Sequence, residues 1–218
     1  MGLFFWRKNK ADAQAEQVES NPAAAQEKPA SEGCLEADVI ASDTHAVLDS
    51  GLDLSDFWYD TKESRLRHTC PPLNDETLRS VEQRLGHRLP KSYVQLMRQH
   101  NGGLVNRCRY PVPNPKQGCP DTVYITDIMG IGDEVPYSLC GSFGSDFLIQ
   151  TRGHKAIGIA LCNTTLPGRA LVFLDYRGAD DYDEPRITWA DAQEHIELPL
   201  ARNFNEFVKG LELNTVQR

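Results

Sequence analysis

Hydrophobic residues between positions 73 and 85 recur at the spacing of one helix face. Leu78, Val81 and Leu85 are three or four residues apart, and polar or charged residues fill the positions between them. This spacing places the three side chains on one side of an α-helix. Asn74 is a good N-cap, and the two acids that follow it suit the positive end of the helix dipole. We therefore predict an amphipathic helix that ends at Gly86.

The segment 89–100 repeats this pattern. Pro90 lies in the first turn, where its missing N–H costs nothing. Residues 101–103 read Asn-Gly-Gly, and such residues tolerate positive φ. They are expected to stop a second helix. The apolar face of that helix consists of Tyr93, Leu96 and Met97.

After position 121 the pattern changes to short apolar or alternating runs bounded by turn residues, which is typical of strands. A last amphipathic helix is predicted over 200–211. The expected fold class is α+β: a two-layer domain with the N-terminal helix pair and the C-terminal helix packed on a mostly antiparallel sheet. The predicted strands are Val123–Met129, Phe147–Ile149, Ala156–Leu161 and Ala170–Tyr176, with Arg186–Trp189 as a further candidate.

Residues 1–55 differ from the rest in composition and charge. They contain 4 basic and 10 acidic residues of the chain's 23 and 31, so most of the net charge of -8 lies there. Residues 11–31 are rich in Ala, Gln and Glu and lack apolar periodicity. We expect a flexible, disordered acidic tail at 1–55 and one folded domain at 56–213. Phe57, Trp58 and Tyr59 are expected to seal the core under the first helix.

The order of the motifs resembles the SUKH (Smi/Knr-type) superfamily. Its amino-terminal signature is matched by Glu82 before Leu85-Gly86, by Leu89-Pro90 and Tyr93 in a second helix, and by the Asn-Gly-Gly stop. The later matches are Asp127-Ile128 with Gly130-Ile131, Gly158–Ala160, Val172–Tyr176 and the closing helix Ala201–Val208, which has Asn203 where the family usually has Ser.

The resemblance implies a binding domain without catalytic activity. Such domains are used mostly as bacterial immunity proteins against secreted polymorphic toxins, or as interaction modules in eukaryotic cell-wall and signalling proteins. Three hypotheses stay open, and the third, an enzyme, would require His and carboxylate groups distant in sequence to converge in a cleft. The first is a cytoplasmic immunity protein that binds and neutralises a cognate toxin. The alternative is a scaffold or regulatory module recruited through its N-terminal tail.

Clustered carboxylates indicate where a partner would bind. The segment 175–184 carries five acids and two tyrosines, which would suit the basic cleft of a nuclease-like toxin by charge complementarity. A solvated loop without a role and a calcium site are the other interpretations, although the spacing departs from the EF-hand order. We also expect an exposed contact at Tyr110, among prolines, and a groove border at Asn101. The predicted partner-binding residues are Tyr110, Asn101, Asp175, Tyr176, Asp180, Asp181, Tyr182, Asp183 and Glu184.

Other chemistry has little support in the sequence. A pI of about 5.2 argues against nucleic acid as a partner. The six cysteines and six histidines show no zinc, redox or metalloprotease spacing, so no metal, cofactor or catalytic residue is predicted and the thiols are expected to be reduced. Residues 1–10, which include the apolar cluster Leu3–Trp6 before three basic residues, are a candidate for weak contact with a membrane surface. The oligomeric state stays open.

Overall fold

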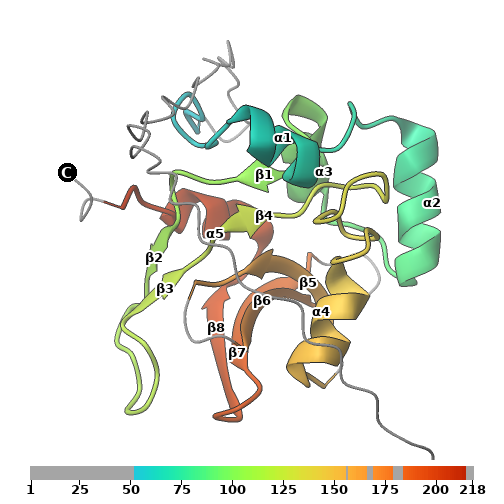
Figure 1. The fold of residues 1–218 in the computed structure, drawn as a ribbon. Coiled ribbons are helices and arrows are strands. Elements are labelled where there is room, and N and C mark those ends of the chain that lie inside the picture. The colour runs from blue at the N-terminus through green and yellow to red at the C-terminus, as the bar shows by residue number, and fades with distance from the viewer. Residues whose placement is uncertain (1–51, 156, 166–168, 179–183, 215–218) are drawn as a thin grey trace, which may run out of the picture. The chain divides into compact units, whose positions relative to one another are not determined.

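The computed structural model describes residues 52–155, 157–165, 169–178 and 184–214 (Figure 1). The chain divides into two units, Met1–Glu36 and Ala37–Arg218, and every described residue belongs to the second. The expected tail therefore lies almost wholly outside the described residues. Leu54, two residues before the expected domain boundary, is buried, as are Phe57 and Trp58, whereas Tyr59 is exposed.

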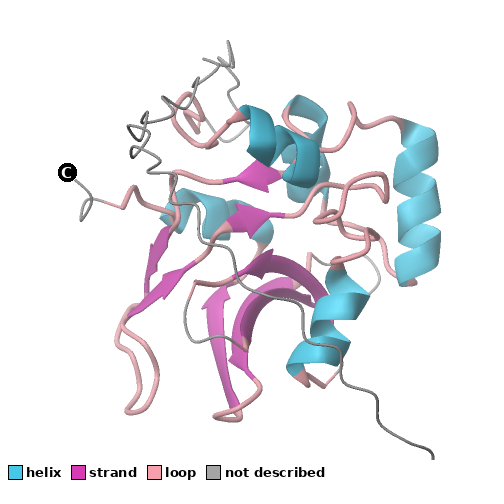
Figure 2. Cartoon of the chain, in the orientation of Figure 1, coloured by secondary structure: helices cyan, strands magenta, loops and turns pink. Residues whose placement is uncertain are grey.

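The described part contains helices and antiparallel sheets, so the α+β class is confirmed (Figure 2). The two predicted N-terminal helices and the C-terminal helix are present. A short helix before them was not predicted, and another replaces a predicted strand. The helices are α1 (Lys62–His68), α2 (Asp75–Leu85), α3 (Lys91–Gln99), α4 (Ser145–Arg152) and α5 (Phe204–Gly210).

The strands form three sheets rather than one. The largest is a four-stranded antiparallel meander in the order β5-β6-β7-β8, and the others are the pairs β1-β4 and β2-β3. Strands β1, β2 and β8 were not predicted. The bounds are β1 (Gly103–Leu104), β2 (Arg109–Pro111), β3 (Thr122–Tyr124), β4 (Asp127–Ile128), β5 (Gly158–Asn163), β6 (Ala170–Asp175), β7 (Arg186–Asp191) and β8 (Ile196–Ala201).

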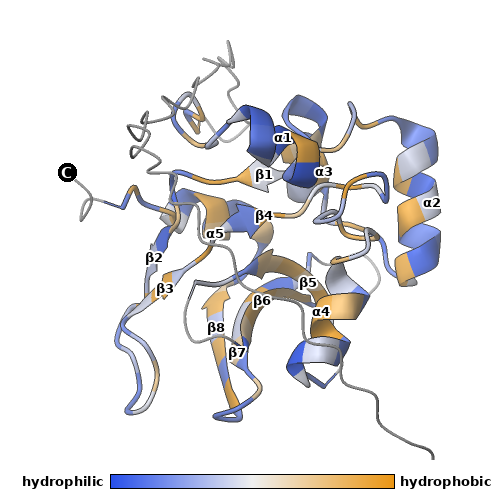
Figure 3. Cartoon of the chain, viewed as in Figure 1, coloured by the Kyte–Doolittle hydropathy of each residue, from blue (hydrophilic) through white to orange (hydrophobic). Residues whose placement is uncertain are grey.

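The core lies where the four-stranded sheet meets the helices. All six residues of β6 are buried, and the strands of this sheet are mostly apolar in Figure 3. Helix α5 packs on β7 and β8, α3 packs on α5, and α4 packs on β5. Tyr93 joins these parts, because its ring lies edge-on to Phe204, with centroids 5.1 Å apart, and its hydroxyl donates to the Met129 carbonyl.

The start of α2 and the connection from α2 to α3 follow the predicted local signals. The Asn74 side chain accepts a hydrogen bond from the Thr77 N–H at 2.8 Å, and Gly86 adopts the left-handed conformation at the helix end, with φ of 72°. The Glu82 carboxylate then accepts from the buried Leu89 N–H at 2.9 Å. This bond ties α2 to the chain that enters α3.

Replacing Glu82 by alanine is expected to lower the free energy of unfolding by about 2 kcal/mol, because a hydrogen bond to a charged group is lost and the Leu89 N–H is left without its partner. Urea unfolding of both proteins measures the difference. The neighbouring exposed residue supplies the control, Gln83→Ala, for which we expect little change. Equal effects of the two substitutions would contradict this role for Glu82.

The predicted strand at Phe147–Ile149 was wrong, because these residues lie in helix α4. Three apolar residues in a row do not distinguish a strand from a buried helix segment. Here Gly144 is the N-cap and Gly153 ends the helix with φ of 76°. Ser145 and Leu148 face the core, whereas Phe147 is exposed.

Candidate functional site

Asn101, expected at the border of a binding groove, is buried instead. Its amide Nδ2 donates to the carbonyls of Pro71 and Ile131 at 2.8 and 3.0 Å, and its Oδ1 accepts from the Ile131 N–H at 2.8 Å. Only 4% of the residue is exposed. The side chain therefore joins three segments of the core and is not available to a partner.

The two glycines after Asn101 serve the same junction. Gly102 has φ of 83°, and a Cβ there would lie 2.2 Å from the backbone nitrogen of Gly130. A Cβ on Gly130 would in turn lie 2.3 Å from the Asn101 carbonyl oxygen. The backbones of these two segments approach so closely that only glycine fits. The Asn-Gly-Gly motif therefore does more than end a helix, because it also lets the segments around residues 102 and 130 pack together.

Tyr110 was expected to be exposed in a loop that forms no ladder, and this was wrong. It pairs with Val123 in the β2-β3 hairpin and is 8% exposed. Its ring stacks on Phe207, with centroids 5.3 Å apart, and its hydroxyl donates to the Leu200 carbonyl at 2.7 Å. Proline removes only its own N–H from the hydrogen bonds between two strands, so a short strand can include Pro111.

Asp175 was expected on the acidic surface but is 1% exposed. Its carboxylate accepts hydrogen bonds from the side chains of Arg177, Arg186 and Thr188, each at 2.9–3.0 Å, and from the Arg177 backbone N–H at 3.0 Å. Burial alone would raise the pKa of Asp175, but these bonds outweigh it and bring the pKa to about 2. The Asp175 carboxylate is therefore ionised, and its charge is balanced by two arginines at the end of β6.

Tyr176 and Glu184 lie at the two ends of the predicted acidic segment, and both contact the start of α3 or the residues before it. The Tyr176 ring stacks on His87 with centroids 4.2 Å apart, and its hydroxyl donates to the Arg88 carbonyl at 2.8 Å. The Glu184 carboxylate accepts from the Ser92 hydroxyl at 3.1 Å. The structure thus brings these two predicted residues to one place, which we name the β6–β7 surface: Tyr176, Glu184, His87, Arg88 and Ser92.

The remaining predicted residues of this segment, Asp180, Asp181, Tyr182 and Asp183, lie outside the described residues. Their role stays a prediction. The charges that flank them are mixed. Arg177 also pairs with Glu197 at 2.7 Å, and both side chains are nearly half exposed. Sequence reasoning missed this pairing, because β8, which carries Glu197, was not predicted.

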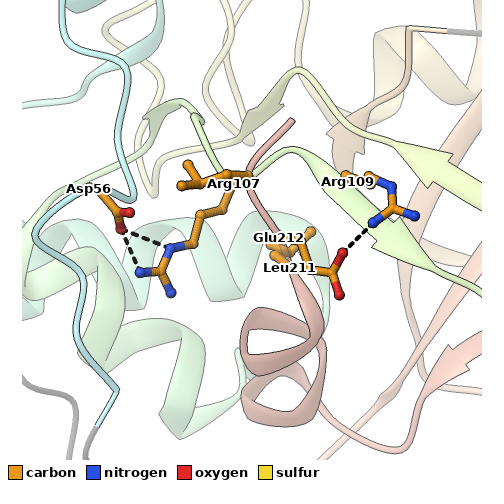
Figure 4. A pocket seen from close by; sticks show the side chains of 6 residues that line it. Asp56, Arg107, Arg109, Leu211 and Glu212 are labelled. Carbon is orange, nitrogen blue, oxygen red and sulfur yellow. Dashed lines mark hydrogen bonds and ion pairs between the residues drawn. The ribbon is translucent and has the colours of Figure 1, made fainter. Parts of the chain in front are cut away.

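A separate pocket of about 390 Å³ lies where the chain leaves α5 (Figure 4). Two arginines line it, and each is paired: Arg107 donates to Asp56 at 2.5 and 2.8 Å, and Arg109 donates to Glu212. The backbones of Arg109 and Glu212 also exchange hydrogen bonds. Because the charges are balanced within the pocket, it ties the end of the domain to β2 rather than offering a site for an anion.

Two buried acids, Asp60 and Asp127, form hydrogen bonds within the domain. Asp60 accepts from Arg65 at 2.9 Å and lies 3.0 Å from the His100 ring, which stacks on Trp58. Burial raises the pKa of Asp60, but the hydrogen bonds and charges of His100 and Arg65 outweigh it and lower the pKa below its ordinary value. Asp127 similarly holds the amide of Asn163. These pairs stabilise the core.

The described cysteines are free, and burial raises the pKa of Cys70 to about 12. Among the described residues no group of three or more His, Cys, Asp or Glu side chains is placed to hold a metal ion. Within that same part of the chain, no helix combines the length and the apolar composition needed to cross a membrane.

Comparison with known proteins gives one match. The profile of the SMI1 / KNR4 family (SUKH-1) matches residues 72–210, which is more than half of the chain. No curated protein and no solved structure matches. The matched range begins just before α2, ends with α5 and includes Glu82, the Asn101–Gly103 junction and Tyr93, whose contacts are described above. The chain therefore belongs to the SMI1 / KNR4 family (SUKH-1).

Proposed function

We propose that this protein is an immunity protein that binds a secreted toxin domain of basic character and neutralises it without catalysis, acting in the cytoplasm. The observation that carries the proposal is the anchoring of the acidic segment. Tyr176 at one end and Glu184 at the other contact the α2–α3 connection and the start of α3. The residues at both ends of the carboxylate-rich segment are thus held in defined positions, which lowers the entropy lost at those ends when a partner binds.

The carboxylates of the proposed contact are those of Asp180, Asp181, Asp183 and Glu184. Asp175 does not contribute, because two arginines neutralise it. Glu184 accepts its hydrogen bond from Ser92, which is a neutral donor. Tyr182 would add an aromatic anchor among the carboxylates. Such a surface would speed the encounter with a basic toxin and cover its cleft.

Reversing three charges tests this proposal. The variant Asp180→Lys, Asp181→Lys, Asp183→Lys is expected to bind the toxin about 100-fold more weakly, mainly through slower association, because charge complementarity steers the encounter. The toxin is first captured from cells of the source organism with the tagged full-length chain and identified by mass spectrometry. Surface plasmon resonance at two salt concentrations then measures both rate constants, and rescue of cell growth measures neutralisation.

A matched control carries the same change in net charge elsewhere. Glu63→Lys, Asp121→Lys, Glu194→Lys replaces three exposed acids outside the segment, and we expect binding within about threefold of the parent protein. Equal weakening by both variants would mean that only the total charge matters. Capture of endogenous partners alone, lost when residues 1–51 are removed, would instead support the scaffold function and contradict the proposal.

A further inference from the structure

Four aromatic rings form a continuous row across the surface of the domain, which we name the aromatic ladder: His68, Tyr137, Phe143 and Phe147. His68 and Tyr137 stack in parallel with centroids 4.4 Å apart. Tyr137 stacks on Phe143 at 5.3 Å, and Phe143 meets Phe147 edge-on at 5.2 Å. The row joins α1, the turn before α4, and α4 itself.

One half of the ladder is open to solvent. Phe143 and Phe147 are 37% and 41% exposed, whereas every other phenylalanine in the described residues is buried. Two adjacent exposed aromatic rings are unfavourable in water unless a partner covers them. Their edge-on arrangement leaves ring surface uncovered. The open end therefore has the character of a contact surface.

The exposed rings stand on a rigid base. The Phe143 N–H donates to the Pro136 carbonyl at 2.8 Å, and the Ser145 N–H donates to the Leu139 carbonyl at 3.0 Å. A Cβ on Gly144 would lie 2.5 Å from the carbonyl oxygens of Ser138 and Leu139, so this turn has no space to expand. In α4, the Ser145 hydroxyl accepts from the Ala160 N–H in β5 at 2.8 Å. Such a surface loses little entropy when it binds.

The chain itself shows what kind of group the ladder accepts. The guanidinium carbon of Arg67 lies over the Tyr137 ring, 5.1 Å from its centroid, and Arg67 also donates to the Tyr137 hydroxyl at 3.2 Å. An arginine of the protein thus already covers Tyr137, in the partly buried half of the ladder. Phe143 and Phe147 have no cation over them among the described residues.

The charge beside the open rings is negative. Asp146 immediately precedes Phe147 in the first turn of α4, is exposed, and forms no ion pair within the described residues. Cys140, three residues before Phe143, lines a cavity of about 240 Å³ together with Glu76 and Glu134. The arginine at this cavity, Arg84, is already paired with Asp133 at 3.8 Å.

We propose that Phe143, Phe147 and Asp146 form a docking site for an arginine side chain of a protein partner, with the guanidinium stacked on a phenyl ring and paired with the carboxylate. We expect the partner segment to be basic, because the cavity that Cys140 lines carries three acids, Glu76, Asp133 and Glu134, against one arginine, Arg84. Arginine fits better than lysine, since its flat guanidinium stacks on aromatic rings and pairs with a carboxylate at the same time. This inference deepens the proposed function and rests on it only in that the partner is a protein.

Binding of a short peptide to the full-length chain tests the site without any toxin. The probe is an acetylated and amidated Gly-Arg-Leu-Arg-Gly peptide, titrated into ¹⁵N-labelled protein. We expect amide shifts concentrated in residues 142–147. The double variant Phe143→Ala, Phe147→Ala should weaken binding about tenfold, and Asp146→Asn about fivefold, as losses of exposed cation–π and ion-pair contacts predict.

Two controls make the test specific. A peptide with citrulline in place of arginine keeps the shape but lacks the charge, and it should bind at least about fivefold more weakly. The variant Tyr59→Ala removes a side chain that is 42% exposed, close to the 41% of Phe147, from the segment before α1, and it should bind like the parent protein. Thermal unfolding verifies that each variant is folded.

Several outcomes would overturn the proposal. Equal binding of the citrulline peptide would show that the rings bind apolar groups without regard to charge. Shifts outside residues 142–147 would place the peptide elsewhere. Self-association in sedimentation velocity that disappears in the phenylalanine double variant would identify a second copy of the chain as the occupant. Because the peptide assay needs no toxin, its failure leaves the charge-reversal test of the acidic segment unaffected, and the reverse also holds.

Discussion

Replacing Asn101 by alanine is expected to lower the free energy of unfolding by about 4 kcal/mol, a large part of the 5–15 kcal/mol that is roughly typical of a domain. The substitution removes three hydrogen bonds and leaves the Ile131 N–H and the carbonyls of Ile131 and Pro71 without their partner. Because Ile131 is fully buried, water cannot easily replace these bonds.

Urea unfolding followed by tryptophan fluorescence measures this effect. Two further variants separate its causes. Asn101→Asp keeps an oxygen that accepts from the Ile131 N–H but loses the donor and adds a buried charge, so it should be at least as unstable near neutral pH. Gln99→Ala, at an exposed position two residues earlier, should change stability little. A loss below about 1 kcal/mol for Asn101→Ala would mean that Asn101 does not hold this junction.

Replacing Asp175 by asparagine is the second large effect, with an expected loss of about 3 kcal/mol near neutral pH. The substitution removes the charge that Arg177 and Arg186 neutralise and places an amide donor against their N–H groups. The two arginines are 44% and 47% exposed and can turn to water, which limits the cost, whereas Thr188 is buried and cannot.

The pH dependence provides a more specific test of Asp175. Its folded-state pKa of about 2 lies below the ordinary value of 3.8, so its contribution is fully present above the ordinary pKa and is lost as the pH falls toward 2. The difference in stability between parent and Asp175→Asn should therefore be constant above about pH 5 and shrink between pH 3.8 and 2.

Unfolding at a series of pH values from 2 to 7 measures this dependence. The control is Glu197→Gln, which removes the other carboxylate on Arg177, an exposed one, and should cost less than about 0.5 kcal/mol. A difference between parent and Asp175→Asn that does not change with pH would show that the ionised Asp175 carboxylate does not stabilise the end of β6.

The parts of the fold that could be predicted are those whose structure depends on residues only a few positions apart in the sequence. Asn74 caps α2 through a bond to a residue three positions on, Gly86 ends that helix at positive φ, and the apolar spacing in α3 identifies its buried face. The family could also be predicted, because its motifs follow one another in order along the chain. Strand β8 was missed, because its last two residues, Leu200 and Ala201, were assigned to the predicted C-terminal helix over 200–211.

The candidate sites were predicted less well, because exposure depends on distant segments. Asp175 is one of several acids in a polar segment, and only the pairing of β6 with β7 places Arg186 and Thr188 beside it. Tyr110 lies among prolines in the sequence, yet Phe207 of α5 stacks on its ring. Conversely, Phe147 has the apolar side chain expected of a core residue but is exposed, because Ser145 and Leu148 lie on the buried side of α4.

The sequence by itself determined the α+β class, the position of α2 and α3, and the family, because helix caps and apolar spacing act over one or two turns of chain. Only the tertiary structure decided that Asn101 and Asp175 are internal anchors and that Phe143 and Phe147 form an exposed surface. The physical reason is that burial and hydrogen-bond partners are supplied by segments such as residues 71, 131 and 186, which are distant along the chain and become neighbours only when it folds.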